Sequence, residues 1–322
     1  MTETPEVSIC LTTFNRANSL SKTIDSILKQ SFRNFELIIT DDNSSDNTEL
    51  LCMDYERRDV RVKYFRNSAN LKMPGNLNKA ISLAKGKYIA NLHDGDIYLP
   101  DLITKWYNTI IKDPQILFVF NQYEAFDEAG KTICIFDHHL AEVNDGRVVR
   151  EYFYRTLSSG PWGTVMARRA AYEEFGFFNS EYGFISDVEM WMRLSTKGKV
   201  GYVNEPLIEL TPREKDHPYF LPHYKLMFLN LKILRNYHII DGEELIIPKK
   251  TIQKNIRLNL GRIVLSLLRK GKWERFREFS YLVFSSPFTG LKIAFIPLLI
   301  FGKKKPEGFD DVEWNKICSI SA

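Results

Sequence analysis

The sequence predicts an α/β fold in which a mostly parallel β-sheet is flanked by helices, followed by a C-terminal helical extension. Two observations predict it. Short β-branched and apolar runs alternate with segments of helical periodicity through the first third of the chain, which is the pattern of βαβ units. Three of these strand-like runs also end in polar or acidic residues. In sheets of this kind, ligands bind at the carboxyl ends of the strands.

The predicted elements follow one another at regular spacing. The strand-like runs cover residues 7–14, 35–42, 60–67 and 87–92, and the helical patterns between them cover residues 19–30, 44–56 and 76–86. Asp46 and Glu49 resemble a capping box for the second helix, and Gly86 is expected to end the third. Each strand is thus followed by a helix, as parallel pairing requires.

The middle of the chain adds strand-like runs at residues 116–126 and 131–137, and a helical pattern that opens at Asp187. From residue 219 onward, the segments 225–237, 251–270 and 273–284 carry apolar residues at spacings of three and four, as helices do. We therefore expect a catalytic domain over residues 1–218 and a helical, basic region over residues 219–322.

Composition limits the classes of protein to consider. The 322 residues are 44% hydrophobic and 13% aromatic, which is enough for a large core and excludes global disorder. The four cysteines are scattered, so we expect reduced thiols in a cytoplasmic protein, with Cys10 in the core. Residues 1–6 have no basic start or apolar segment, so a secretory signal is not expected.

The net charge of +4 is unevenly distributed. Residues 245–322 contain 15 Lys+Arg against 6 Asp+Glu, and the rest of the chain contains 29 against 34. A basic tail of this kind favours anionic membranes or nucleic acid. Within it, residues 291–301 are nearly all apolar, but a spanning helix needs about 20 apolar residues. Two interpretations stay open for this segment: an interfacial element anchored by the following lysines, or a helix packed on the catalytic domain.

The polar strand ends predict a shared site. The first strand ends in Thr12–Arg16, the second in Asp41 and Asp42, and the fourth in His93, Asp94 and Asp96. A divalent cation would remove the repulsion between Asp94 and Asp96, whereas a solvated turn is the simpler alternative. No G-x-G-x-x-G follows the first strand and no G-x-x-x-x-G-K-[ST] occurs, so neither a dinucleotide-binding dehydrogenase nor a P-loop NTPase is supported.

Three blocks, at residues 7–48, 84–101 and 186–194, together resemble glycosyltransferase family 2. This family consists of inverting nucleotide-sugar transferases of the A-type glycosyltransferase (GT-A) fold. The resemblance covers about the first 210 residues and depends on the ordered combination of the blocks rather than on any single motif.

The resemblance implies roles for individual residues. Thr12, Phe14, Asn15 and Asp42 would hold the base and ribose of the donor nucleotide, together with Asp94. Phe14 offers a face for stacking on a base, and Asp42 can accept an N–H from a uracil-like edge. Asp187 precedes a W-x-R-L helix, the position of the catalytic base in this family; a helix N-cap is the simpler alternative.

The family's aspartate motif after the fourth strand implies a divalent metal, Mn²⁺ or Mg²⁺, held by Asp94 and Asp96. Hard cations of this kind take carboxylate and phosphate oxygens. The sequence departs from the family at Gly95, where many relatives have an acidic residue, so Asp94 or Asp96 would have to take its place. Lys72 is the only cation in the loop at residues 70–78, where relatives often have an arginine for the diphosphate.

Other candidate residues have two interpretations each. Trp162 either stacks on an acceptor sugar or belongs to the core, and His93 lies beside the acidic motif without an assigned role. His138 and His139 are expected at the surface.

The resemblance thus predicts an inverting transferase that moves a sugar, from UDP in preference to other nucleotides, to a saccharide hydroxyl. The basic tail suggests a lipid-linked acceptor, as in bacterial surface polysaccharide assembly, and a cytoplasmic protein at the inner face of the plasma membrane. The alternatives are a non-catalytic nucleotide-binding module of the same fold, a nucleotidyltransferase and a nucleic-acid binder. The acidic strand ends argue against nucleic acid as a partner.

Overall fold

The computed structural model describes residues 4–126, 130–136, 138–156, 164–210 and seven positions between 233 and 244. The chain divides into two compact units, of which the first comprises residues 1–153, 158–220 and 232–245. Nearly all described residues belong to this first unit. The expected helices at residues 251–270 and 273–284, the apolar segment at 291–301 and Trp162 lie outside the described residues, as does most of the expected helix at 225–237.

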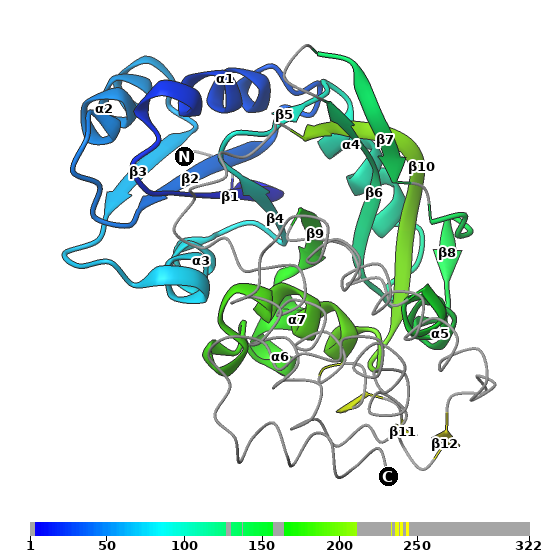
Figure 1. The fold of residues 1–322 in the computed structure, drawn as a ribbon. Helices are drawn as coiled ribbons and strands as arrows, with labels where there is room; N and C mark the ends of the chain where they lie inside the picture. Colours follow the sequence, from blue (N-terminus) through cyan, green and yellow to red (C-terminus); the bar gives the residue numbers. More distant parts are fainter. Residues whose placement is uncertain are drawn as a thin grey trace, which may run out of the picture. The chain divides into compact units, whose positions relative to one another are not determined.

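One large mixed sheet forms the centre of the first unit (Figure 1). Its strand order within the described residues is β3-β2-β1-β4-β9-β6-β10-β5, with β7 beside β6 and β8 beside β10. The strands are β1 (Val7–Thr13), β2 (Phe35–Asp41), β3 (Val62–Arg66), β4 (Tyr88–His93), β5 (Ile97–Tyr98), β6 (Ile116–Phe126), β7 (Thr132–Phe136), β8 (Val143–Asn144), β9 (Val165–Arg168) and β10 (Lys199–Leu210). The short pair β11 (Ile239–Ile240) and β12 (Glu243–Glu244) forms a separate ladder.

The sheet confirms the α/β prediction and refines it. Strands β3, β2, β1 and β4 are parallel, as the alternation of strands and helices predicts. Strand β9 runs antiparallel to both of its neighbours, β4 and β6, and β10 runs parallel to β6. Beyond β4 the sheet is therefore mixed.

The helices are α1 (Ala17–Leu28), α2 (Thr48–Arg58), α3 (Lys72–Leu83), α4 (Leu102–Ile110), α5 (Gly146–Thr156), α6 (Arg169–Phe175) and α7 (Ser186–Leu194), with a 3₁₀ segment η1 (Ser180–Ile185) before α7. Figure 1 shows α1 and α2 on one side of β1–β3 and α3 on the other. Strand β2 is buried along its whole length, as a parallel strand covered on both faces must be. Helix α1 buries Leu20, Ile24 and Ile27 at spacings of three and four, which gives it one apolar face.

Two expected helix ends differ from the structure. Helix α3 ends at Leu83 and Ala84 is already extended, so Gly86 does not end it. A Cβ at Gly86 would lie 2.6 Å from the backbone nitrogen of Ser8, so the glycine is needed for close approach to β1. Asp46 and Glu49 do not form a capping box: Asp46 accepts hydrogen bonds from the backbone and hydroxyl of Thr48, whereas Glu49 pairs with Arg66.

The prediction for His138 was wrong, and that for Cys10 is confirmed. His138 is 5% exposed and lies among the rings of Phe120, Tyr152 and Tyr202, whereas His139 is exposed. Cys10 is fully buried, and burial raises the pKa of its thiol. A buried thiol of this kind is an inert core residue.

Candidate active site

The carboxyl ends of β1, β2 and β4 lie side by side. Thr13 pairs with Asp41 of β2, and Thr12 pairs with His93 of β4. The structure thus brings together the three polar strand ends that the sequence singled out, because β1 lies between the other two strands.

Asn15 joins the loops that follow β1 and β2. Its backbone nitrogen donates to the Ser44 hydroxyl at 2.8 Å, and its side-chain oxygen accepts from the Ser45 nitrogen at 2.8 Å. Asn15 has a positive φ of 52°, which asparagine tolerates better than most residues. The side chain is therefore engaged within the chain, while Thr12 and Phe14 beside it are half-buried.

The two aspartates that end β2 have different partners. Asp41 is fully buried and accepts from the backbone of Ser44 and, at 2.8 Å, from the hydroxyl of Tyr64. Burial and this hydrogen bond to Asp41 both raise the pKa of Tyr64. Asp41 therefore shapes the turn after β2, with one oxygen accepting from Ser44 and the other from Tyr64.

Asp42 holds the loop that leads into α3. One of its oxygens accepts from the Asn67 amide at 3.0 Å and the Leu71 nitrogen at 2.7 Å, and the other from the Lys72 nitrogen at 2.8 Å. Asp42 is 3% exposed. A carboxylate oxygen has two acceptor positions, so the oxygen facing Lys72 retains capacity for one further donor.

The acidic turn after β4 is held by α1. Gly95 has a φ of +92° and its nitrogen donates to the Thr23 hydroxyl at 3.0 Å, while that hydroxyl donates to the Asp96 carbonyl at 2.9 Å. Sequence reasoning missed Thr23. The available signal was a polar residue on the buried face of α1, where an unpaired hydroxyl would be costly.

Asp94 and Asp96 are placed differently. Asp94 is partly exposed, with the Thr13 hydroxyl at 3.0 Å and the Arg16 Nε at 3.9 Å from one of its oxygens. Asp96 is 2% exposed. Thr13 and Arg16 thus contact a candidate site residue, and the sequence analysis assigned neither a role, although both lie in its first strand-end block.

Asp94 and Asp96 fit a divalent cation only if substrate phosphates complete its coordination. No group of three His, Cys, Asp or Glu side chains within the described ranges is arranged to hold a metal ion. Mg²⁺ in nucleotide sites, however, is commonly bound by one or two carboxylates together with substrate phosphates. The partly exposed Asp94 fits that arrangement, and the buried Asp96 fits it less well.

Asp187 lies on a separate element. It is half-buried in the first turn of α7, and its Oδ1 accepts from the Val188 nitrogen at 2.8 Å. Ile185 occupies the N-cap position, so the alternative that Asp187 is the cap is not supported. The chain before α7 is tied to α3, because Asn78 exchanges two hydrogen bonds with the backbone of Phe178 at 2.9 and 3.1 Å.

The comparisons with known proteins assign the class. The mixed sheet with its flanking helices is similar to the Staphylococcus aureus TarS structure in complex with UDP-GlcNAc, at a TM-score of 0.61 and 15% identity over 91% of this chain and 80% of that one. It is also similar to GalNAc-T7 with UDP, GalNAc and Mn²⁺, at a TM-score of 0.53 and 16% identity over 72% of this chain and 49% of that one. The fold is therefore the GT-A fold.

The model of glycosyl transferase family 2 matches residues 8–175, and the chain belongs to this family. EpsE of Bacillus subtilis is 28% identical over 63% of this chain and 71% of its own length. WfgD of Escherichia coli, named as a UDP-Glc:α-D-GlcNAc-diphosphoundecaprenol β-1,3-glucosyltransferase, is 33% identical over 38% of this chain and 47% of its own. The Campylobacter jejuni GalNAc(5)-diNAcBac-PP-undecaprenol β-1,3-glucosyltransferase is 40% identical over 29% of this chain and 30% of its own.

Proposed function

We propose that the protein is an inverting glycosyltransferase that moves a sugar from UDP to a saccharide hydroxyl. The observation that carries this proposal is the hydrogen bond between Thr13 and Asp94, which builds the ends of β1 and β4 into one polar site. The names of relatives support the donor class: WfgD is named for UDP-Glc, and TarS was solved with UDP-GlcNAc.

Three residues, Thr12, Phe14 and Asp42, would bind the nucleoside, and Asn15 would support them. Phe14 and Thr12 are half-buried at the end of β1, where a ring face and a hydroxyl can meet a base and a ribose. Asp42 would accept the base N–H on the oxygen that faces Lys72. Asn15 acts by holding the loops after β1 and β2 together, since its side-chain oxygen is occupied by Ser45.

Asp94 would hold a divalent cation, Mn²⁺ or Mg²⁺, with Asp96 as the second candidate. Such a cation, when bound, stabilises the charge of the leaving nucleoside diphosphate. Thr13 orients the Asp94 carboxylate, and the Arg16 guanidinium beside it adds positive charge on the same side. Arg16 would thereby support diphosphate binding as well.

Asp187 would act as the general base. Its carboxylate takes the proton of the acceptor hydroxyl while that oxygen forms a bond to the anomeric carbon, and the bond from this carbon to the diphosphate breaks on the opposite side. The UDP leaves with the bonding electrons. This single displacement inverts the anomeric carbon and needs no covalent intermediate with the enzyme.

A lipid-linked saccharide is the acceptor class that we propose, in polysaccharide assembly at the inner face of the plasma membrane. Two relatives are named for undecaprenol-linked acceptors, and residues 245–322 carry the positive charge that an anionic membrane attracts. No helix within the described part of the chain is long and apolar enough to cross a bilayer. Deletion of residues 286–322 should abolish flotation of the protein with anionic vesicles; unchanged flotation would contradict the membrane proposal.

Calorimetric binding of UDP, GDP, dTDP and CDP, each with Mn²⁺ and with chelator, tests the proposal. Binding of UDP in preference to the others is expected, and a loss of affinity on chelation would support the cation at Asp94. Chelator-insensitive binding of UDP would remove the cation from the proposal and keep the donor. If none of the four binds, both the transferase and the nucleotide-binding module are contradicted. Binding of UDP without turnover of any UDP-sugar would favour the non-catalytic module.

A further inference from the structure

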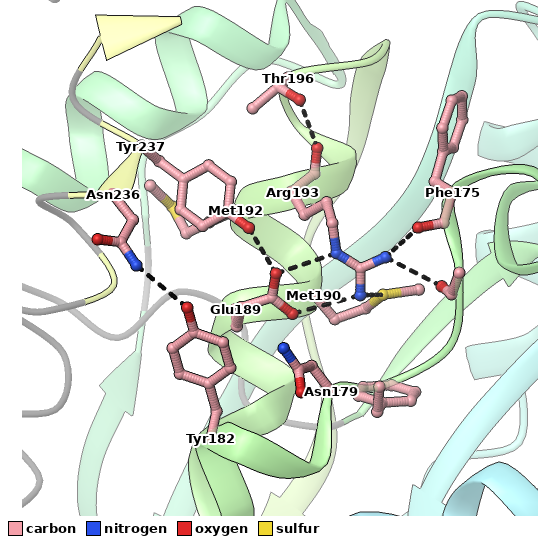
Figure 2. Close-up of polar contacts among 12 residues, drawn as sticks. Phe175, Asn179, Tyr182, Glu189, Met190, Met192, Arg193, Thr196, Asn236 and Tyr237 are labelled. Carbon is pink, nitrogen blue, oxygen red and sulfur yellow. Dashed lines mark hydrogen bonds and ion pairs between the residues drawn. The ribbon is translucent and has the colours of Figure 1, made fainter.

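Glu189, Arg193 and Tyr237 form a partly buried network of three side chains (Figure 2). Glu189 is on α7, 4% exposed, and both of its oxygens contact Arg193, at 3.0 and 3.3 Å. The hydroxyl of Tyr237 donates a third hydrogen bond to Glu189. Burial, and then this hydrogen bond, raise the pKa of Tyr237.

Arg193 ties α7 to the end of α6. Its guanidinium donates to the carbonyls of Phe175, Gly176 and Phe177, at 3.1 Å to Gly176 and 2.8 Å to Phe177. These carbonyls follow the last turn of α6, where a cation is favoured by the helix dipole and by the unsatisfied acceptors. The planar guanidinium can serve Glu189 and these carbonyls at once, which an ammonium group cannot.

Tyr237 ties the same carboxylate to a segment about 50 residues further along the chain. Its nitrogen donates to the carbonyl of Ile233 at 3.2 Å, and Ile233 is fully buried. Beside it, the Asn236 amide donates to the Tyr182 hydroxyl of η1 at 3.1 Å. Three elements, α6, η1–α7 and the segment at residues 233–237, therefore meet at or beside Glu189.

Helix geometry separates this network from the substrate side. Residues two apart on an α-helix project about 200° from one another, whereas residues four apart share a face. Glu189 and Arg193 thus share one face of α7, and Asp187 projects from the opposite side. Burial and the ion pair of both oxygens with Arg193 argue against Glu189 as the base; Tyr237 donates to one of these oxygens.

We propose that Glu189, Arg193 and Tyr237 form a positioning triad that fixes the rotation of the first turn of α7, and with it the direction of the Asp187 carboxylate. The inference rests on the proposed role of Asp187 as the base. A buried ion pair gives little net stability compared with apolar packing, but it holds one geometry through directional bonds. Transfer is sensitive to that geometry, since small displacements of a catalytic group cost about 100-fold in rate.

The test compares Tyr237→Phe with Tyr55→Phe. Tyr55 is the matched control because it is also buried and its hydroxyl also donates to a carboxylate, that of Asp25 at 2.7 Å. It lies on α2 and not on α7. Turnover is measured as release of UDP from whichever of UDP-glucose, UDP-galactose, UDP-GlcNAc and UDP-GalNAc the wild type hydrolyses, since water attack needs the same base. We expect Tyr237→Phe to lower kcat about tenfold with the KM for the UDP-sugar within about twofold, and Tyr55→Phe to leave kcat unchanged.

Hydrogen exchange gives a second readout that needs no substrate. Tyr237→Phe should speed amide exchange in the peptide that covers residues 186–190, and Tyr55→Phe should not. Unchanged exchange there, unchanged kcat, or an equal loss of kcat in Tyr55→Phe would each overturn the positioning role.

Arg193→Lys replaces Tyr237→Phe if the latter does not fold. The same loss of kcat is expected, because the ammonium group cannot bridge Glu189 and the carbonyls at the end of α6. Full activity of Asp187→Asn would contradict the base assignment alone, because the exchange result still reports on the triad.

Discussion

The hydroxyl of Thr13, at the end of β1, donates a 3.0 Å hydrogen bond to the carboxylate of Asp94, in the turn after β4. The two residues are 81 positions apart in the chain and come together because β1 and β4 pair in parallel. This bond connects the nucleoside side of the proposed site to its diphosphate side.

Thr13→Val should therefore weaken UDP binding more than it weakens the fold. The substitution keeps the shape of the side chain and removes one hydrogen bond, which is worth about 1 kcal/mol, or roughly fivefold in affinity. Calorimetry with UDP and Mn²⁺ measures the effect. Thr104→Val, which removes an exposed hydroxyl contact to Ser31 on another part of the fold, should leave UDP affinity unchanged; an equal loss in both variants would contradict the prediction.

Gly95 lies in the acidic turn, and Gly130, which lies elsewhere, is a matched control for its substitution. Both have a positive φ, +92° and +77°, and a Cβ would meet nothing within 4 Å at either position. Alanine should thus cost about 1–2 kcal/mol of stability at each site, through backbone strain alone. Only Gly95→Ala should also weaken UDP binding, because it shifts the turn that carries Asp94. Denaturant unfolding and calorimetry separate the two effects, and equal UDP affinities in the two variants would show that this turn does not support the nucleotide.

Substitution of Asp41 should mainly lower stability, whereas substitution of Asp42, the next residue, should mainly lower UDP affinity. Asp41→Asn removes a fully buried acceptor that Ser44 and the partly buried Tyr64 share, so we expect a loss of about 2 kcal/mol in the free energy of unfolding. Asp42→Asn replaces the oxygen that accepts from the Lys72 nitrogen with an amide group, although Asn70 also accepts from that nitrogen at 3.0 Å. The substitution removes the charged acceptor proposed for the base N–H and should lower UDP affinity by about tenfold. Should the two variants lose stability and affinity in the same proportion, the division of roles between these residues would be wrong.

Asp187→Asn tests the base. The amide is nearly isosteric and cannot take a proton from the acceptor, so turnover should fall by at least about 100-fold. UDP affinity should stay within about twofold of the wild type, because Asp187 lies on α7 and not at the strand ends. Activity near the wild-type level would remove Asp187 from the chemistry.

The contact between Asp59 and Arg61 predicts a pH dependence of stability. Arg61 donates three hydrogen bonds to Asp59, at 2.7–3.0 Å, and these lower the pKa of the Asp59 carboxyl. A lowered folded-state pKa gives stability that is present above the unfolded value, near 3.9, and is lost as the pH falls through the folded value. Asp59→Asn should therefore reduce the free energy of unfolding at about pH 6 and have little effect at about pH 2. A constant difference across this range would contradict the assignment.

The local sequence pattern predicted the bounds of strands more accurately than it predicted helix starts that depend on tertiary contacts. The run at residues 116–126 coincides with β6, and the run at 35–42 exceeds β2 by one residue, because a short apolar run rich in β-branched and aromatic residues is a property of the segment itself. Helix α3 begins four residues before the expected start. The turn into it is set by Asp42, which accepts from the nitrogens of Leu71 and Lys72, and no local rule contains that contact.

The sequence by itself determined the parallel half of the sheet, the family and the three polar strand ends, since these follow from periodicity and from the order of motifs along the chain. Only the tertiary structure decided how the polar residues divide their roles. It placed β9 antiparallel between β4 and β6, buried His138 and Asp41, and left Asp94 partly exposed beside Thr13 and Arg16. The physical reason is that hydrogen-bond partners and solvent exposure depend on residues distant in the chain, which strand pairing brings together.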